Sequence, residues 1–161
     1  RQEVPGIHLR TTLMVGFPGE TEEDFNELKE FIQKARFDRM GAFAYSEEEG
    51  TFGAENFKDS ISARVKQERL DELMTLQSEI SLAYNQSRTG TEVKVIVDDF
   101  SDGVYVCRSE FESPEVDGEI LVRHDSSVLG DVDPYSMIGE FMTVRITGAD
   151  EYDLIAEPLE I

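Results

Sequence analysis

The first part of the chain alternates between strand-like and helix-like patterns of apolar residues. Residues 9–17 predict a buried strand, because residues 13–15 form a short apolar run that is bounded by Gly16, Pro18 and Gly19. Thr21, with Asp24 three residues later, predicts the start of a helix. The apolar face of this helix has residues at steps of three and four: Phe25, Leu28, Ile32 and Ala35. Residues 40–45 predict a second strand, so the region is a strand–helix–strand unit with parallel strands.

The second part contains only short strand-like segments separated by turn-forming residues. After a polar loop over residues 46–58, the spacing of apolar residues predicts a long helix over residues 60–87. Five strand candidates follow, over residues 92–97, 104–108, 119–124, 141–146 and 154–157. They predict a small closed or nearly closed antiparallel barrel, because a sandwich usually needs more strands.

The two parts also differ in charge. Residues 1–88 hold 17 acidic and 11 basic residues, a net charge of −6, whereas residues 89–161 hold 18 and 4, a net charge of −14. We therefore predict three regions: residues 1–58, a linking helix over residues 59–88, and an all-β barrel over residues 89–161. Two parallel strands need neighbours that bury both of their faces. Residues 1–58 are thus expected to be the C-terminal remnant of a larger α/β barrel.

Composition narrows the class of protein. The chain has 161 residues, of which 39% are hydrophobic, enough for a folded core. Its one cysteine excludes a disulfide framework and an all-cysteine metal site within this chain. No apolar run approaches the ~20 residues of a membrane helix, and residues 1–10 do not resemble a signal peptide, so we expect a cytoplasmic protein without a membrane partner. The formal net charge of −20 disfavours RNA and favours basic partners.

Two loops carry candidate chemistry, and each has a simpler alternative. The glycines of residues 16–20 would let the backbone approach a ligand closely. Acidic residues crowd the helix start that follows and no basic residue is adjacent in the sequence, which disfavours a phosphate. This loop either holds an uncharged, flat ligand or is a tight turn. Residues 45–51 include three consecutive glutamates, which either bind a cation or a basic substrate or form a solvated acidic loop.

The remaining reactive side chains give weaker signals. His8 and His124 are far apart in the sequence and share no spacing typical of paired ligands, which disfavours a metal-binding or proton-transfer role. Cys107 is expected to be a small, half-buried side chain in a strand rather than a nucleophile. We therefore predict no catalytic residue and no metal ligand within this chain.

Several longer motifs resemble the methylthiotransferases of the radical S-adenosylmethionine superfamily. They are residues 9–25 (LRTTLMVGFPGETEEDF), 36–41 (RFDRMG), 45–51 (YSEEEGT) and 77–81 (QSEIS). The barrel resembles the C-terminal TRAM domain of these enzymes, a small OB-like barrel. The resemblance implies an α/β plus all-β fold: the end of a radical-SAM barrel followed by a five-stranded antiparallel TRAM barrel.

Two branches of this family compete. Residues 113–118 (SPEVDG), 146–154 (ITGADEYDL) and 37–39 (FDR) resemble the branch that methylthiolates an aspartate of small-subunit ribosomal protein twelve. The acidic barrel agrees, because a ribosomal protein is basic. The alternatives are the branch that modifies a tRNA adenosine next to the anticodon, with an RNA-binding barrel, and a non-catalytic acidic module that binds proteins.

The resemblance implies the chemistry of the intact enzyme. Such enzymes use S-adenosylmethionine and two 4Fe–4S clusters. A radical abstracts hydrogen from the aspartate β-carbon, and sulfur and a methyl group are then added. The cysteines that hold both clusters are absent from this chain. It is therefore expected to be the C-terminal part of the enzyme and to be inactive alone.

The resemblance also implies roles for individual residues. Four residues at the end of the first strand are expected to lie against the adenine and a fifth to close the same pocket: Val15, Gly16, Phe17, Pro18 and Tyr45. Five barrel acids are expected to dock the basic ribosomal protein, including when it is part of an assembling subunit: Glu115, Asp117, Asp150, Glu151 and Asp153. Because Glu47 stands where many relatives have proline, the resemblance assigns no substrate contact to the loop 45–51.

Overall fold

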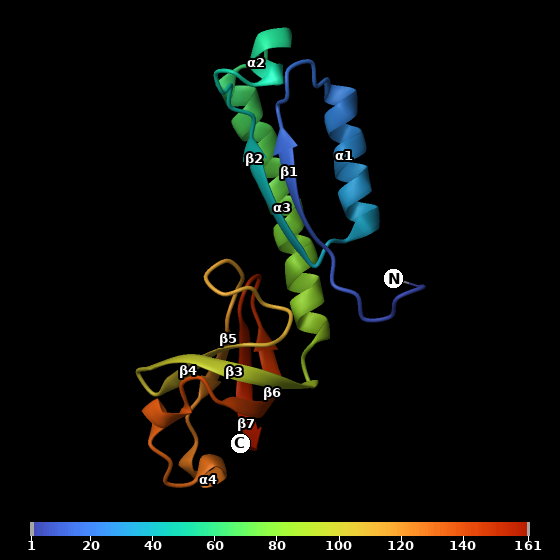
Figure 1. Ribbon diagram of the computed structural model, residues 1–161. Helices are drawn as coiled ribbons and strands as arrows, with labels where there is room; N and C mark the ends of the chain where they lie inside the picture. The colour runs from blue at the N-terminus through green and yellow to red at the C-terminus, as the bar shows by residue number, and fades with distance from the viewer. Residues whose placement is uncertain (1, 161) are drawn as a thin grey trace. The chain divides into compact units, whose positions relative to one another are not determined.

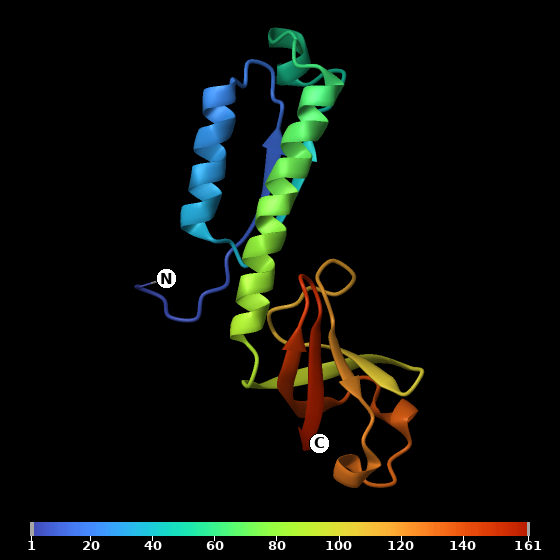
Figure 2. The same cartoon turned by 180° about the vertical axis from the view of Figure 1, so that it is seen from behind.

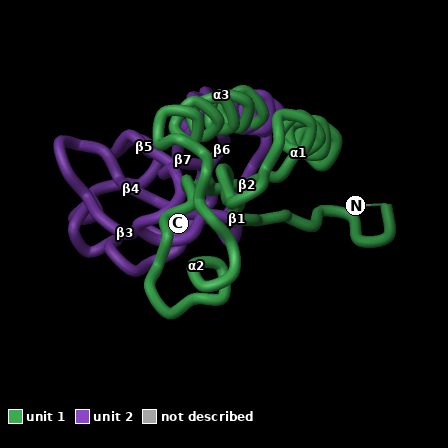
Figure 3. Tube along the Cα trace, turned by 90° about the horizontal axis from the view of Figure 1, so that it is seen from above, with its two compact units in different colours: residues 1–80 green, residues 81–161 purple. Residues whose placement is uncertain are grey.

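The computed structural model describes residues 2–160, and the chain divides into two compact units. Figure 3 colours unit 1, residues 1–80, and unit 2, residues 81–161. The boundary falls inside helix α3 (Ala63–Ser87), so this helix contributes to both units. The predicted three-part division is finer than these two units and stays a prediction. No helix within residues 2–160 is long and apolar enough to span a membrane.

Unit 1 is built on two parallel strands, β1 (Arg10–Val15) and β2 (Arg39–Ala44). Helix α1 (Glu22–Ala35) and the first part of α3 cover the same face of this pair, as Figures 1 and 2 show from opposite sides. The buried core that they share consists of Val15, Phe25, Ile32, Met40, Leu73 and Ile80. The opposite face of the strands exposes Met14 and Phe43. The predicted strand–helix–strand unit is confirmed.

Local signals explain where the helices of unit 1 begin. Thr21 accepts a hydrogen bond from the backbone N–H of Asp24, and the Asp24 carboxylate accepts one from the N–H of Thr21, so the predicted cap of α1 is confirmed. The predicted polar loop after β2 contains a short helix, α2 (Phe52–Asn56), which begins at Thr51. Five residues are too few to show the periodic apolar pattern of a helix, so this helix was not predicted. Its only local signal in the sequence is the capping residue Thr51.

Unit 2 is a closed five-stranded barrel. Its strands are β3 (Glu92–Ser101), β4 (Val104–Arg108), β5 (Ile120–Arg123), β6 (Phe141–Ala149) and β7 (Leu154–Glu160), in the order β3-β4-β5-β7-β6. Two short helical turns, α4 (Ser126–Leu129) and η1 (Pro134–Met137), lie between β5 and β6. Alternate residues such as Val95 and Val97 fill the barrel core, as expected for strands with one buried face.

The barrel differs from the prediction in one pairing. All five predicted strands are present and four of their pairings are antiparallel, but β5 and β7 run parallel. This pairing closes the barrel, because β7 enters between β5 and β6. The alternation of apolar residues predicts strands but carries no information on which strand lies beside which.

Candidate functional site

Unit 2 brings two acidic turns side by side. Loop 113–119 precedes β5, and turn 150–153 joins β6 to β7. The backbone N–H of Glu119 donates to Oδ1 of Asp153 at 2.8 Å. Gly118 lies so close to turn 150–153 that a Cβ atom on it would overlap a backbone carbonyl oxygen of that turn. All five acids predicted to dock the partner lie on these two joined segments.

The carboxylates of these five acids differ in what they contact. Asp117 accepts a hydrogen bond from the backbone N–H of Ser113 at 2.7 Å, and Asp153 holds the start of β5. Both carboxylates therefore shape the turns. The other three acids have exposed side chains that a partner can reach: Glu115, Asp150 and Glu151.

The last turns of α3 hold turn 150–153 in place. Asn85 is fully buried, and its amide donates to the carbonyl oxygen of Asp150 at 2.9 Å. The hydroxyl of Ser81 donates to the carbonyl oxygen of Glu151 at 2.7 Å. These bonds bind the main chain of the turn, so the carboxylates of Asp150 and Glu151 are left facing outward for other contacts.

A buried ion pair fixes the chain between α3 and the barrel. The guanidinium of Arg88 lies 2.6 Å from the carboxylate of Glu112, and both side chains are almost completely buried. The hydroxyl and the backbone N–H of Ser109 also donate to Glu112. Burial raises the pKa of Glu112, but the hydrogen bonds from Ser109 and the charge of Arg88 outweigh it and lower this pKa overall. Glu112 is thus a structural carboxylate that is ionised at neutral pH.

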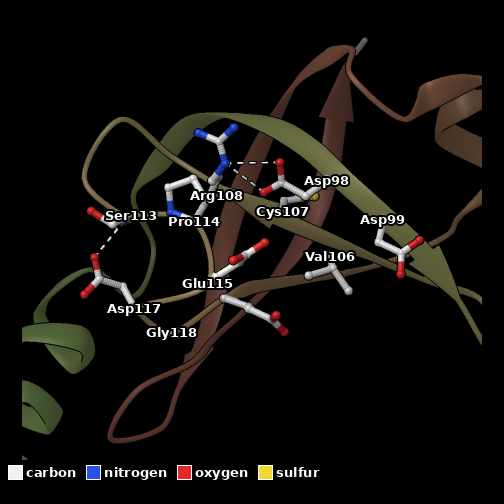
Figure 4. A pocket seen from close by; sticks show the side chains of 11 residues that line it. Asp98, Asp99, Val106, Cys107, Arg108, Ser113, Pro114, Glu115, Asp117 and Gly118 are labelled. Atoms are coloured by element: carbon white, nitrogen blue, oxygen red, sulfur yellow. Dashed lines mark hydrogen bonds and ion pairs between the residues drawn. The ribbon is translucent and has the colours of Figure 1, made fainter.

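A pocket of about 580 Å³ opens next to loop 113–119 (Figure 4). It is lined by Asp98, Asp99, Val106, Cys107, Arg108, Ser113, Pro114, Glu115, Asp117, Gly118 and Glu119. Figure 4 shows the guanidinium of Arg108 facing Asp98, at 2.9 Å, and Asp117 facing Ser113. Five carboxylates against one guanidinium make this wall of unit 2 strongly negative, which suits a cationic side chain.

Most basic residues of the barrel are already engaged. Arg108 pairs with Asp98, and Arg145 pairs with glutamates at 2.9 and 3.4 Å. The ammonium of Lys94 lies 4.6 Å from the centre of an aromatic ring. Two of the four basic residues after residue 88 therefore already have carboxylate partners, and a third lies over an aromatic ring.

Cys107 is expected to be unreactive in the folded protein. Its side chain is buried in the barrel core, and burial raises the pKa of its thiol to about 12. A disulfide reagent such as dithionitrobenzoate should modify it only after the chain unfolds in guanidinium chloride. A Ser127→Cys variant, at an exposed position, should release one equivalent of thionitrobenzoate at once. Rapid modification of native Cys107 would contradict its assignment as a core side chain. The side chain of Cys107 is thus fully buried, whereas the sequence predicted a half-buried side chain.

Unit 1 places the predicted cofactor residues at the end of β1. Val15, Gly16 and Pro18 are buried, whereas Phe17 exposes about 40% of its surface. The N–H of Gly16 donates to the carboxylate of Glu20. Of the four residues in this segment, Phe17 is the one whose side chain a ligand can reach directly.

Two cations that the sequence did not indicate lie behind this segment. Lys66, on α3, donates to the backbone carbonyl of Tyr45 at 3.0 Å and pairs with Asp59. A Cβ atom on Gly16 would overlap the side chain of Lys66, and Gly16 also has a positive φ of 72°. Arg69 pairs with Glu20 at 3.2 Å. No basic residue is adjacent to this loop in the sequence, but α3 brings Lys66 and Arg69 against it in the fold. Both cations are paired, so neither offers a phosphate site.

A second pocket, of about 420 Å³, lies beside Phe17 and Tyr45. It is lined by Met14, Phe17, Phe43, Ala44, Tyr45, Ser46, Glu48, Thr51 and Gly53. The rings of Phe17 and Tyr45 meet edge to face, with centroids 5.2 Å apart. Two of the five residues predicted for the cofactor pocket thus share one cavity, and the other three do not line it.

The described residues do not fit an iron–sulfur cluster. Residues 2–160 contain no group of three or more histidine, cysteine or acidic side chains placed to hold a metal ion. The single cysteine is buried in the barrel core, and its thiol is protonated at neutral pH. The ligands of any cluster would have to come from outside these residues.

Comparison with known proteins supports this architecture. Residues 89–159 match the TRAM domain family, and the match spans all five strands of the barrel. Unit 2 contains a TRAM domain. The two acidic turns and the Figure 4 pocket are therefore features of the TRAM barrel.

Several curated relatives match almost the whole chain. Over 159 residues, 99% of its length, the chain is 60% identical to the ribosomal protein uS12 methylthiotransferase RimO of Phocaeicola vulgatus and 56% identical to that of Bacteroides thetaiotaomicron. Over 156 residues it is 46% identical to the protein of the same name from Caldanaerobacter subterraneus subsp. tengcongensis. The chain spans about a third of the length of these relatives, 34–35%, and matches their C-terminal part. The predicted relationship to methylthiotransferases is confirmed.

Proposed function

We propose that the chain is the C-terminal part of an enzyme that methylthiolates the β-carbon of an aspartate in small-subunit ribosomal protein twelve. Its share of the work is to dock that basic protein and to support the cofactor pocket. The observation that carries the docking role is the pair of joined turns with three outward-facing carboxylates, Glu115, Asp150 and Glu151. The three relatives described above are each named ribosomal protein uS12 methylthiotransferase, and these names support the choice of substrate.

In the intact protein, S-adenosylmethionine and two 4Fe–4S clusters would supply radical hydrogen abstraction, sulfur insertion and methyl transfer. The residues of this chain fit a supporting role toward the cofactor. Phe17 offers an exposed ring on which a flat base can lie, and Lys66 and Arg69 fix the loop that carries it. Val15, Gly16 and Pro18 would contribute through the backbone, and Tyr45 through the wall of the cavity.

The acidic TRAM barrel favours a protein substrate over RNA. A net charge of −14 over residues 89–161 would repel a polyanion, whereas it speeds encounter with a basic protein. The substrate would be met in the cytoplasm, either free or on an assembling ribosomal subunit. Asp117 and Asp153 would act by shaping the docking turns, since their carboxylates contact backbone N–H groups.

Binding to two partners over a salt series tests this function. Ribosomal protein twelve should bind the chain, and raising sodium chloride from about 50 to 300 mM should weaken binding because exposed charges are screened. A tRNA anticodon stem-loop should not compete. Fluorescence anisotropy with labelled partners gives both affinities. Binding of the stem-loop alone would move the assignment to the tRNA-modifying branch.

Charge removal on turn 150–153 is expected to weaken docking about twofold to thirtyfold, as for two surface ion pairs. The variant is Asp150→Asn combined with Glu151→Gln, which leaves the hydrogen bonds to the main chain intact. A matched control, Glu27→Gln with Glu79→Gln, removes the same charge from exposed positions of unit 1. Equal affinity of the two double variants would show that overall charge, and not this turn, attracts the partner.

A further inference from the structure

The two joined turns of unit 2 expose apolar side chains as well as acids. Tyr152, in turn 150–153, exposes 54% of its surface, and Val116, in loop 113–119, exposes 71%. The barrel of unit 2 is closed, so a missing strand does not account for this exposure. Exposed apolar side chains that gather on adjoining segments mark a contact surface, and the larger of these two is an aromatic ring.

The side chain of Tyr152 makes no polar or aromatic contact of its own. Among residues 2–160, its ring packs on no other ring and its hydroxyl has no hydrogen-bond partner. Tyr135, which exposes 64% of its surface in the same unit, differs, because its ring meets that of Phe100 at a centroid distance of 5.3 Å. Tyrosine is enriched among the residues that contribute most to protein–protein binding. Tyr152 is therefore well placed to contact a partner.

The backbone beneath Tyr152 is held on several sides. The N–H of Asp150 donates to the carbonyl oxygen of Asp153 at 2.8 Å and closes the turn. The bonds from α3 described above hold the first two carbonyl groups of the turn, and Gly118 lies against the third, that of Tyr152 itself. A side chain on a fixed backbone loses less conformational entropy when it binds, so this turn presents a preorganised ring.

The charges around the ring are all negative. Residues 109–122 and 146–160 contain five acids each and no lysine, arginine or histidine. In the turn itself, Glu151 and Asp153 flank Tyr152 in the sequence. An anionic partner would be repelled here and an apolar one would bury carboxylates without a counter-ion, whereas a cation would gain both ion-pair and cation–π contacts.

We propose that Tyr152 is the central contact of the docking surface and stacks on an arginine side chain of the basic partner. A guanidinium is planar and weakly hydrated, so its face lies on an aromatic ring while its N–H groups donate to carboxylates, here those of Asp150 and Glu151. The ammonium of a lysine is strongly hydrated and gains less from such a ring. This inference rests on the proposed basic substrate, and it names the residue and the partner side chain that give docking its affinity.

Substitutions of Tyr152 test the contact through the affinity for ribosomal protein twelve, measured by fluorescence anisotropy. Tyr152→Ala should weaken binding about tenfold, and Tyr152→Phe, which keeps the ring, should stay within about twofold of the unmodified chain. Tyr152→Leu keeps apolar volume without a ring and should lose nearly as much as Tyr152→Ala. The matched control is Tyr135→Ala, which removes an exposed tyrosine elsewhere on the barrel and should bind like the unmodified chain.

A second probe tests the preference for arginine without the ribosomal protein. The chain is labelled with 3-fluorotyrosine, and the ¹⁹F NMR signals of Tyr152 and Tyr135 are assigned by replacing each with phenylalanine. Hexa-arginine should shift the Tyr152 signal further than hexa-lysine at the same concentration and leave the Tyr135 signal in place. The methyl NMR signals of Met137 and Met142, which are buried in the barrel core, check that each variant is folded.

Three results would overturn the proposal: unchanged affinity in Tyr152→Ala, full affinity in Tyr152→Leu, or equal shifts of the Tyr152 signal with both hexapeptides. These outcomes are separate from the test of the proposed function. A Tyr152 shift with hexa-arginine, but no affinity for ribosomal protein twelve, would keep this contact and reject the proposed substrate. Binding of the ribosomal protein that Tyr152→Ala leaves unchanged would keep the substrate and reject the contact.

Discussion

Replacing Glu112 with glutamine is expected to lower the free energy of unfolding of unit 2 by about 3–5 kcal/mol. The change leaves the buried guanidinium of Arg88 without its counter-ion, and an unpaired buried charge is among the most costly defects a protein can carry. Urea unfolding followed through the methyl signals of Met137 and Met142 reports on the barrel core itself.

Two comparisons make this prediction specific. Glu68→Gln breaks the exposed Arg64–Glu68 pair of α3 and should cost less than about 1 kcal/mol. Replacing both buried partners, Arg88→Met with Glu112→Leu, should recover most of the loss because no charge is then stranded. An effect of Glu112→Gln no larger than that of Glu68→Gln would falsify the assignment of a structural ion pair.

The buried Arg88–Glu112 ion pair also predicts how the stability of unit 2 depends on pH. The pKa of Glu112 is lower in the folded chain than its usual value, so the folded state binds this proton less readily than the unfolded state. Its stabilising contribution is therefore complete near neutral pH and is lost as pH falls through the folded pKa. The acid limb of the stability curve of unit 2 should be less steep in the Arg88→Met, Glu112→Leu variant.

Replacing Gly118 with alanine is expected to cost at least about 2 kcal/mol and to weaken docking of a basic protein. The added Cβ would overlap the carbonyl oxygen and carbon of Tyr152, which are backbone atoms and cannot move aside alone. The overlap would separate loop 113–119 from turn 150–153 and break the bond from Glu119 to Asp153.

The matched control is Gly41→Ala, at an exposed position in β2 where a Cβ atom meets nothing within 4 Å. That variant should unfold at nearly the same urea concentration as the unmodified chain. If Gly118→Ala kept both its stability and its affinity for ribosomal protein twelve, the close contact between the two turns would not matter for docking.

Much of the fold follows from local patterns in the sequence. The cap of α1 needed only Thr21 and Asp24, and the inward positions of the barrel strands needed only alternation. The parallel β5–β7 pairing and the helix α2 were missed. The β5–β7 pairing depends on which strands become neighbours when the barrel closes. Helix α2 is too short to show a helical period.

The sites divide in the same way. The sequence identified the acids of both turns, but it could not show that Asp117 and Asp153 contact backbone N–H groups while Asp150 and Glu151 face outward. Lys66 was missed because it stands 50 residues after the loop that it supports. A contact between residues far apart in the sequence cannot be predicted from the local pattern of either segment.

The bonds from Ser81 and Asn85 to turn 150–153 have a consequence for the evolution of the protein. Both side chains donate hydrogen bonds to backbone carbonyl oxygens, which every amino acid provides. The residues at 150 and 151 can therefore change identity while the anchoring bonds stay the same. Selection, or a designer, can thus retune the charge of this surface toward a new partner with little effect on folding of the barrel that presents it.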